Sequence, residues 1–218
     1  MLLVRDSMTQ EVVTVAPETT AAEALALCRM NRIRHLPVLQ GGRLVGVISD
    51  RDLRAATPAL GDQARAEALH RLQIADEMAR DVVTARPEDP IEAAAMAMYE
   101  RKIGCLPVVD GEDLVGIVTS SDVLRALVRL VGVHEPGSRL EIALPSRSGS
   151  LAEVTGIIRD EGVDIVSVLA SSEHEDKAGE RVAVLRVATI NPKGVVESLN
   201  AAGYPVLWPP AGPEQEPT

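Results

Sequence analysis

The chain has 218 residues, of which 46% are hydrophobic and 25% charged, so it is long enough for one large domain or two small globular ones. Its formal net charge is −10, which argues against a nucleic-acid partner because such affinity comes largely from basic patches. No segment approaches the ~18 apolar residues of a membrane span, and neither Cys28 nor Cys105 belongs to a CxxC or Cys/His cluster. We therefore expect a cytoplasmic protein with reduced thiols and without a metal site.

The first 56 residues predict the order strand, helix, strand, strand, helix. The first helix begins at a capping box, in which the side chains of Thr20 and Glu23 satisfy N–H groups at the helix start. Glycines after Gln40 predict a hairpin turn between the two central strands. The remaining predicted elements are a strand at Val12–Val15, the paired strands Leu36–Leu39 and Leu44–Ser49, and a second helix opening at Asp50–Ala55.

The same pattern returns after an offset of 70 residues without a gap. The matching positions include Met8 with Met78, Ile33 with Ile103, Leu36-Pro37-Val38 with Leu106-Pro107-Val108, Gly46 with Gly116, and Asp52 with Asp122. Such register over most of a domain indicates an internal duplication. In the second copy we expect Asp89 to cap the helix and Pro90 to occupy its first position.

The duplication predicts the domain organisation of the first 132 residues. Repeat 1 spans residues 1–56, a partly helical connector spans 57–73, and repeat 2 spans 74–132. A single copy of this size buries little apolar surface. We therefore expect the two copies to pack face to face about a pseudo-two-fold axis, which leaves equivalent clefts between them.

The remainder of the chain predicts a ferredoxin-like βαββαβ domain at residues 138–208, followed by a disordered tail at 209–218. A capping box at Ser150–Glu153 opens its first helix, and Gly162 ends that helix. Asn191 is expected to cap the second helix. The remaining predicted elements are strands at Arg139–Leu144, Val163–Ser171, Arg181–Thr189 and Tyr204–Trp208, a polar hairpin loop at Ser172–Glu180, and a helix at Pro192–Ala202. The fold class is therefore α/β (α+β).

Both copies of the repeat end in the motif Gly-x-x-Ser/Thr-x-x-Asp, at Gly46–Asp52 and Gly116–Asp122. The serine or threonine ends a strand and begins a helix, where hydroxyl and N–H groups suit phosphate oxygens. The aspartate one turn later can accept hydrogen bonds from both hydroxyls of a ribose. The alternative is structural, because the same residues serve as ordinary helix N-caps and first-turn acids.

Together with the Asp-x-Met and Leu-Pro-Val segments of each copy, this motif resembles a tandem pair of CBS domains, a Bateman module. The resemblance implies regulatory binding of AMP, ADP, ATP or S-adenosylmethionine, without a catalytic cofactor. It implies that the ligand is bordered by Thr14, Arg34, His35, Pro37, Ser49, Arg51, Asp52, Thr84, Cys105, Pro107, Thr119 and Asp122. We expect Cys105 to act as an apolar wall rather than as a nucleophile, since no His or Asp partners it.

The two expected sites are not equivalent in charge. Arg34 and Arg51 of repeat 1 are replaced by Gly104 and Ser121 in repeat 2. The hypothesis is that the first site prefers a phosphorylated adenosine ligand, whereas the second binds more weakly or takes a less anionic adenosyl compound.

The segment Leu144–Val154 resembles the start of an ACT domain, which implies dimerisation or amino-acid binding. The candidate amino-acid site is Ser146, Ser148, Gly149 and Ser150, although Ser146 and Ser148 replace the usual Asp and Pro. The whole order resembles the accessory proteins of bacterial acetoin utilisation. The expectation is a non-catalytic, homodimeric regulator acting on an undefined target protein. The alternative is a constitutive scaffold with degenerate sites.

Overall fold

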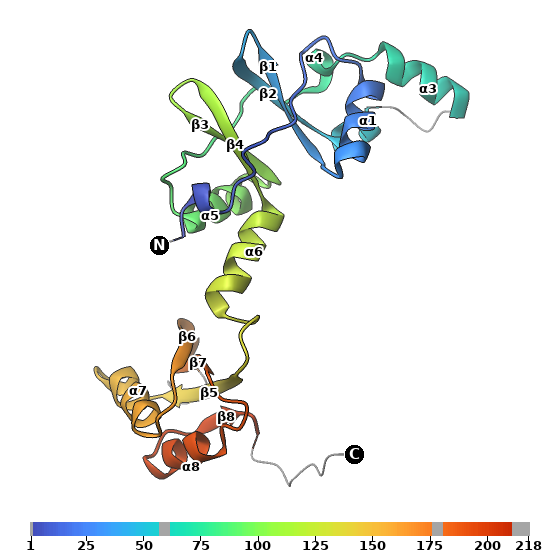
Figure 1. Ribbon diagram of the computed structural model, residues 1–218. Coiled ribbons are helices and arrows are strands. Elements are labelled where there is room, and N and C mark those ends of the chain that lie inside the picture. Colours follow the sequence, from blue (N-terminus) through green and yellow to red (C-terminus); the bar gives the residue numbers. More distant parts are fainter. Residues whose placement is uncertain (1, 57–61, 176–180, 211–218) are drawn as a thin grey trace. The chain divides into compact units, whose positions relative to one another are not determined.

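The computed structural model describes residues 2–56, 62–175 and 181–210, and the chain divides into two compact units, Met1–Ala126 and Leu127–Thr218 (Figure 1). The predicted tail lies almost wholly outside the described residues. The first unit contains η1 (Val4–Asp6), α1 (Ala21–Asn31), β1 (His35–Gln40), β2 (Arg43–Ser49), α2 (Asp50–Ala55), α3 (Asp62–Arg71), α4 (Ile74–Glu77), α5 (Ile91–Arg101), β3 (Cys105–Asp110), β4 (Asp113–Thr119) and the start of α6 (Ser120–Val131).

Each repeat contributes one antiparallel hairpin, β1–β2 or β3–β4, with the same register in both copies. The hairpins turn at glycines in the left-handed region, including Gly41 at φ +59° and Gly111 at φ +63°. The capping box of α1 is confirmed, because the Glu23 carboxylate accepts a hydrogen bond from the Thr20 N–H at 2.9 Å. The duplication is therefore reproduced at the level of backbone pairing.

The strand predicted at Val12–Val15 is not formed. Only Val15 pairs with β1, as an isolated parallel bridge in which its N–H donates to the Pro37 carbonyl at 3.1 Å. The Leu39 N–H in turn donates to the Val15 carbonyl at 2.8 Å. Extending the bridge toward Val12 would need a hydrogen bond from the N–H of Pro37, which proline lacks, so pairing is confined to Val15.

The segments that begin the two repeats are exchanged between the two hairpins. Val4 and Met8 of repeat 1 pack in the core that contains β3, β4 and α5. Ile74 and Met78 of repeat 2 pack in the core that contains α1, β1 and β2. Isolated bridges join Thr9 to Ile117 and Val47 to Ala79 in the same exchanged manner. The sequence repeats are therefore not identical with the packed cores.

The predicted start of α5 is wrong by one residue. Pro90 is the N-cap rather than the first helical residue, at the position that Thr20 occupies in repeat 1. The Asp89 carboxylate is engaged before the helix, where it accepts a hydrogen bond from the Arg86 N–H at 2.7 Å. The Asp89 side chain, which was expected to cap α5, therefore stabilises the turn at residues 86–89 instead.

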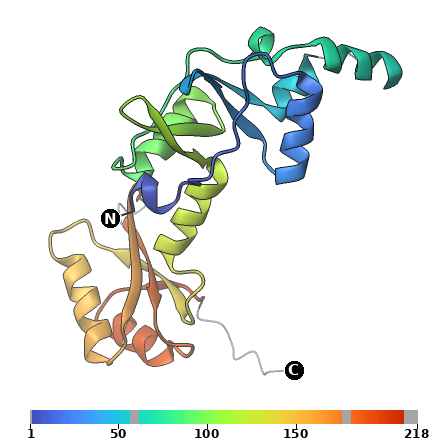
Figure 2. The same ribbon diagram turned by 45° about the horizontal axis from the view of Figure 1, so that its top comes forward.

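The second unit confirms the ferredoxin-like prediction. Its four strands form one antiparallel sheet in the order β6-β7-β5-β8. The helices and strands contribute to a single apolar core, and both helices cover the same face of the sheet (Figures 1 and 2). The elements are β5 (Ser138–Leu144), α7 (Ser150–Asp160), β6 (Ile165–Glu175), β7 (Arg181–Val187), α8 (Lys193–Ala201) and β8 (Val206–Trp208).

Several local predictions in this unit need correction. Strand β6 continues to Glu175, into the segment expected to be a loop, because Glu175 still pairs with Arg181. Residues 176–180 of that loop lie outside the described residues. Helix α8 is capped by Pro192, although the Asn191 carboxamide oxygen accepts a hydrogen bond from the Lys193 N–H at 3.3 Å.

The expected capping box at Ser150–Glu153 is absent, since Gly149 is the N-cap of α7 at φ +93°. The Ser150 hydroxyl donates within the preceding loop instead, 2.8 Å from the Pro145 carbonyl oxygen. The predicted stop at Gly162 is confirmed, with φ +70° and its N–H donating to the Arg159 carbonyl.

Candidate functional site in the first unit

Ser49 and Asp52 form a capping box at the start of α2. The Asp52 Oδ2 atom accepts hydrogen bonds from the Ser49 N–H at 3.2 Å and the Ser49 hydroxyl at 2.5 Å. The Asp52 N–H donates back to the Ser49 hydroxyl oxygen at 3.2 Å. The helix-capping role, which was the alternative to ligand binding, is therefore present. It uses only the Oδ2 atom of the Asp52 carboxylate.

Thr119 and Asp122 repeat this contact at the start of α6. Asp122 Oδ2 accepts from the Thr119 N–H at 2.9 Å and from its hydroxyl at 2.6 Å. The second carboxylate is buried, with 7% of its surface exposed, whereas Asp52 is exposed. Its Oδ1 atom also lies 3.4 Å from Arg125 Nη1. The two aspartates therefore share one geometry but differ in burial and in charged partners.

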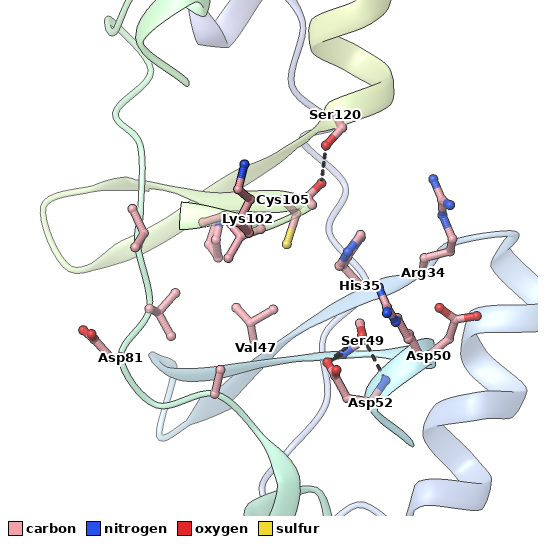
Figure 3. A pocket seen from close by; sticks show the side chains of 17 residues that line it. Arg34, His35, Val47, Ser49, Asp50, Asp52, Asp81, Lys102, Cys105 and Ser120 are labelled. Atoms are coloured by element: carbon pink, nitrogen blue, oxygen red, sulfur yellow. Dashed lines mark hydrogen bonds between the residues drawn. The ribbon is translucent and has the colours of Figure 1, made fainter. Parts of the chain in front are cut away.

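A cleft of about 660 Å³ opens beside Ser49 and Asp52. Figure 3 shows Ser49, Asp52 and Val47 on one wall, and Lys102 and Cys105 on the wall that faces it. Both repeats therefore build this first cleft. Its lining is Arg34, His35, Val47, Ser49, Asp50, Arg51, Asp52, Ala79, Asp81, Val82, Val83, Lys102, Ile103, Gly104, Cys105, Pro107 and Ser120.

A smaller second cleft of about 250 Å³ lies beside Thr119 and Asp122. It is also built from both repeats, with the exchanged segment at residues 9–13 in the place that residues 79–83 take in the first cleft. Its lining is Thr9, Glu11, Val12, Val13, Arg32, Ile33, Arg34, His35, Ile117, Thr119, Ser121, Asp122 and Arg125.

One cation in each cleft comes from the C-terminal end of a helix in the opposite repeat. Arg32 follows α1 with φ +54° and lines the second cleft, whereas Lys102 follows α5 with φ +57° and lines the first. The Lys102 Nζ atom lies 4.3 Å from the centre of the Tyr99 ring, within the range of a cation–π contact.

Burial sets the protonation states of His35 and Cys105. It lowers the pKa of His35, an effect increased by the positive charge of Arg34 and opposed by Asp50 and Asp52. It raises the pKa of the Cys105 thiol to about 12. Both side chains are therefore uncharged near neutral pH, and Cys105 has no thiolate character to make it a nucleophile.

The loop before α7 in the second unit holds a separate polar cluster. Arg147 binds both oxygens of the Glu153 carboxylate, at 2.6 and 2.7 Å, and the Tyr204 hydroxyl donates to the same carboxylate. Ser150 is buried, and its hydroxyl also lies 2.9 Å from the Arg147 carbonyl oxygen. Ser146, Ser148 and Gly149 are exposed on this loop.

Within residues 2–56, 62–175 and 181–210, no three His, Cys, Asp or Glu side chains form a group that could hold a metal ion. No helix in these ranges combines the length and hydropathy needed to span a membrane.

The CBS domain model matches residues 4–58 and 73–129, together more than half of the chain. The chain belongs to the CBS domain family. The ACT domain model matches residues 138–203, so a CBS pair is followed by an ACT domain.

Solved CBS structures resemble the first unit. A Vibrio cholerae structure described as an acetoin utilization protein (AcuB) is 32% identical with a TM-score of 0.52, covering 62% of this chain and 96% of that one. The CBS pair of MJ0100, in complex with 5′-methylthioadenosine and S-adenosyl-L-methionine, is 32% identical with a TM-score of 0.50, covering 58% and 96%. CBSX2 in complex with AMP is 30% identical with a TM-score of 0.51, covering 60% and 99%.

Curated relatives include both small CBS proteins and enzymes. CBS domain-containing protein YhcV of Bacillus subtilis is 34% identical over 122 residues, which are 56% of this chain and 83% of the relative. Inosine-5′-monophosphate dehydrogenase of Methanocaldococcus jannaschii is 28% identical over 217 residues, but the match spans only 41% of that enzyme.

The CBS clefts bring together most, but not all, of the predicted ligand residues. The first contains Arg34, His35, Ser49, Arg51, Asp52, Cys105 and Pro107, and the second contains Arg34, His35, Thr119 and Asp122. Thr14, Pro37 and Thr84 line neither cleft, and contact with a ligand stays a prediction for all the residues named from the sequence. Pro37 is buried in β1, and Thr84 is exposed just before the bridge at Ala85.

Sequence reasoning missed the cations Arg32 and Lys102 and the exchanged segment at residues 79–83. The two cations occupy equivalent repeat positions directly after the first helix of each copy. That equivalence is visible in the sequence, and it could have identified them. Which cleft each one lines depends on how the repeats pack.

Proposed function

We propose that the protein is a non-catalytic cytoplasmic regulator that binds an adenine nucleotide or another adenosyl compound in its CBS clefts. The observation that carries this proposal is the repeated Ser/Thr–Asp contact, each copy of which borders a cleft built from both repeats. Support comes from CBSX2 with AMP and from the MJ0100 CBS pair with S-adenosyl-L-methionine. The proposed domain bounds are those predicted from the sequence.

The ribose is assigned to the two aspartates. Asp52 uses Oδ2 in its capping box, which leaves Oδ1 to accept from ribose hydroxyls. The apolar side chains of Val82 and Val83 and the small Cys105 thiol line the same cleft and suit the flat face of a base. Arg51 and Lys102 supply positive charge for a phosphate.

The two sites are proposed to differ in preference. Arg51 lines only the first cleft, and Ser121 takes its place in the second. In the second cleft Arg125 already pairs with Asp122, so this cation and this carboxylate must be shared with any ligand. A phosphorylated ligand is therefore assigned to the first cleft, and a weaker or less anionic adenosyl ligand to the second.

Regulation would follow from the composite walls of each cleft. A ligand in the first cleft touches Asp52 from repeat 1 and Lys102 from repeat 2. Such a ligand favours the arrangement of the repeats in which both contacts are made, and it shifts the population toward that state. The target that reads this change is proposed to be another protein, bound by a homodimer.

For the ACT domain we propose self-association, with amino-acid sensing as the second candidate. Strand β6 ends the sheet order and exposes Val168 and Leu169, which suits pairing with another copy. Amino-acid sensing is the second candidate because the Ser150 hydroxyl, in the candidate amino-acid loop, is already hydrogen-bonded to carbonyl oxygens of that loop.

The proposal is tested by calorimetry and thermal shift with AMP, ADP, ATP and S-adenosylmethionine, and with amino acids for the ACT domain. Asp52→Ala should abolish the tighter step for AMP, and Asp122→Ala the weaker one. Asp76→Ala is the matched control, because Asp76 also accepts from a helix-start N–H, that of Gln73 at 3.4 Å, but lines neither cleft. A ligand at ~100 times its Kd should stabilise the fold by about 2.7 kcal/mol.

Unchanged binding in both aspartate variants would contradict the assignment of the sites. Absence of any adenosyl binding would instead favour the constitutive scaffold. Turnover of a substrate by the purified protein would contradict the non-catalytic assignment.

A further inference from the structure

Arg34 and His35 line both clefts. Among the described residues they are the only ones common to the two linings. The other cations belong to one cleft each, with Arg51 and Lys102 in the first, and Arg32 and Arg125 in the second. One arginine residue therefore lines both candidate anion sites.

The duplication does not supply a second copy of this pair. The equivalent residues of repeat 2 are Gly104 and Cys105, which carry no charge. The missing side chain at Gly104 leaves the space that His35 fills, because a Cβ atom there would lie 2.8 Å from His35 Nε2. Two identical repeats would each carry an Arg–His pair at this position, whereas this chain carries one pair, in repeat 1.

The backbone of Arg34 is held by a hydrogen bond, whereas no ion pair with another described residue holds its guanidinium. Its carbonyl oxygen accepts a hydrogen bond from the Asp50 N–H at 2.9 Å, which ties it to the start of α2. Figure 3 shows its side chain extending away from Asp52. The long, flexible side chain can therefore orient its guanidinium toward a phosphate in either cleft, but it can compensate only one at a time.

We propose that Arg34 couples the two clefts, so that a phosphorylated ligand in the first weakens the binding of a phosphorylated ligand in the second. The proposal rests on the proposed function, because it requires adenosyl ligands in both clefts. His35 brings no second positive charge to the junction, since its half-buried ring is neutral near neutral pH. An uncharged ligand such as adenosine does not compete for Arg34 and binds the two clefts independently.

The test measures AMP affinity of the second cleft by calorimetry, with the first cleft either saturated or emptied. Asp52→Ala empties it, and Ala79→Phe does so independently by placing a large side chain at an exposed position that lines only the first cleft. The second-cleft step is identified as the one lost in Asp122→Ala. Emptying the first cleft should tighten this step about tenfold, within the usual range of coupling between sites.

The Arg34→Gly variant introduces the residue that repeat 2 carries, and in it emptying the first cleft should leave the second-cleft affinity unchanged. The matched control is Arg29→Ser, which also removes an exposed arginine of repeat 1 but at a position that lines neither cleft. This control should retain the tenfold effect. Adenosine should show no effect in any of these proteins.

Equal second-cleft affinity for AMP with the first cleft full or empty would overturn the coupling while leaving the proposed function intact. Persistence of the tenfold effect in Arg34→Gly would overturn the role of Arg34. Failure of AMP to bind either cleft would contradict the proposed function, and the coupling with it.

Discussion

His35 of β1 packs against the backbone of Gly104, which precedes β3. A Cβ atom built on Gly104 would lie 2.8 Å from His35 Nε2 and 3.0 Å from His35 Cε1. Both distances are shorter than ordinary van der Waals contact, so the two repeats meet at a point where only glycine fits beside the imidazole. The contact joins the start of one hairpin to the start of the other.

Gly104→Ala should lower the free energy of unfolding by about 1–3 kcal/mol, the usual cost of an added methyl group in a packed contact. The loss should be much smaller in a His35→Ala background, because the atoms that clash are then absent. Urea unfolding of the wild type, the two single variants and the double variant measures this coupling.

Gly156→Ala is the control for a change of glycine to alanine without a clash. Gly156 lies in α7, and a Cβ atom there would meet no atom within 4 Å beyond its chain neighbours and the nearby backbone of its own helix. Alanine should therefore stabilise the second unit, by roughly 0.5–1 kcal/mol.

Strictly additive losses in the Gly104 and His35 double variant would show that the two residues do not interact.

The exchanged segments predict a second sensitive glycine. A Cβ atom at Gly46 would lie 2.6 Å from Met78 Sδ and 3.2 Å from the Ala79 carbonyl oxygen. The backbone oxygen cannot move aside like a side chain, so we expect Gly46→Ala to cost about 1–3 kcal/mol even in a Met78→Ala background.

Gly116 offers the matched position, since its Cβ atom would lie 2.6 Å from Met8 Sδ and 3.1 Å from the Thr9 carbonyl oxygen. Gly116→Ala should therefore destabilise the first unit to a similar extent, measured by thermal unfolding. If truncation of either methionine fully restored stability, the backbone contacts would not limit these positions.

The Arg147–Glu153 pair predicts a pH dependence for the second unit. Hydrogen bonds from Arg147 and then from Tyr204 lower the pKa of Glu153 from 4.5 to about 2. Because the folded-state pKa lies below the unfolded value, the pair contributes stability above about pH 4.5. This contribution is lost as the pH falls toward 2 and the carboxylate takes up a proton.

Glu153→Gln should therefore lower the melting temperature of the second unit at pH 7, and the difference from the wild type should shrink between pH 4.5 and 2. Glu141→Gln is the control, because Glu141 also pairs with an arginine, Arg139, but belongs to β5 outside this loop. If the difference in melting temperature between Glu153→Gln and the wild type stayed constant over this pH range, ionisation of Glu153 would not be the source of the stability.

Several features followed from the sequence because they depend on neighbours along the chain. The capping contact of Thr20 with Glu23 joins residues three apart, and so does that of Ser49 with Asp52. The hairpin turns, the duplication and the βαββαβ order are likewise written in local patterns of polarity and glycine. The position of each aspartate at a helix start was determined in this way.

Other features were decided by tertiary packing. Whether Ser150 caps α7 or donates to the Pro145 carbonyl depends on the path of the loop, and the same holds for Asp89 before α5. No local pattern shows that residues 4–8 pack with the second hairpin, because two homologous hairpins offer chemically similar surfaces.

The sequence alone determined that a Ser/Thr–Asp pair begins a helix in each repeat, and that an Arg–His pair is present in one copy only. Only the tertiary structure decided which residues face one another. It placed Lys102 opposite Asp52 and put Arg34 at the junction of both clefts. The physical reason is that local hydrogen bonds form within a few residues, whereas a cleft is created by contacts between segments about 70 residues apart.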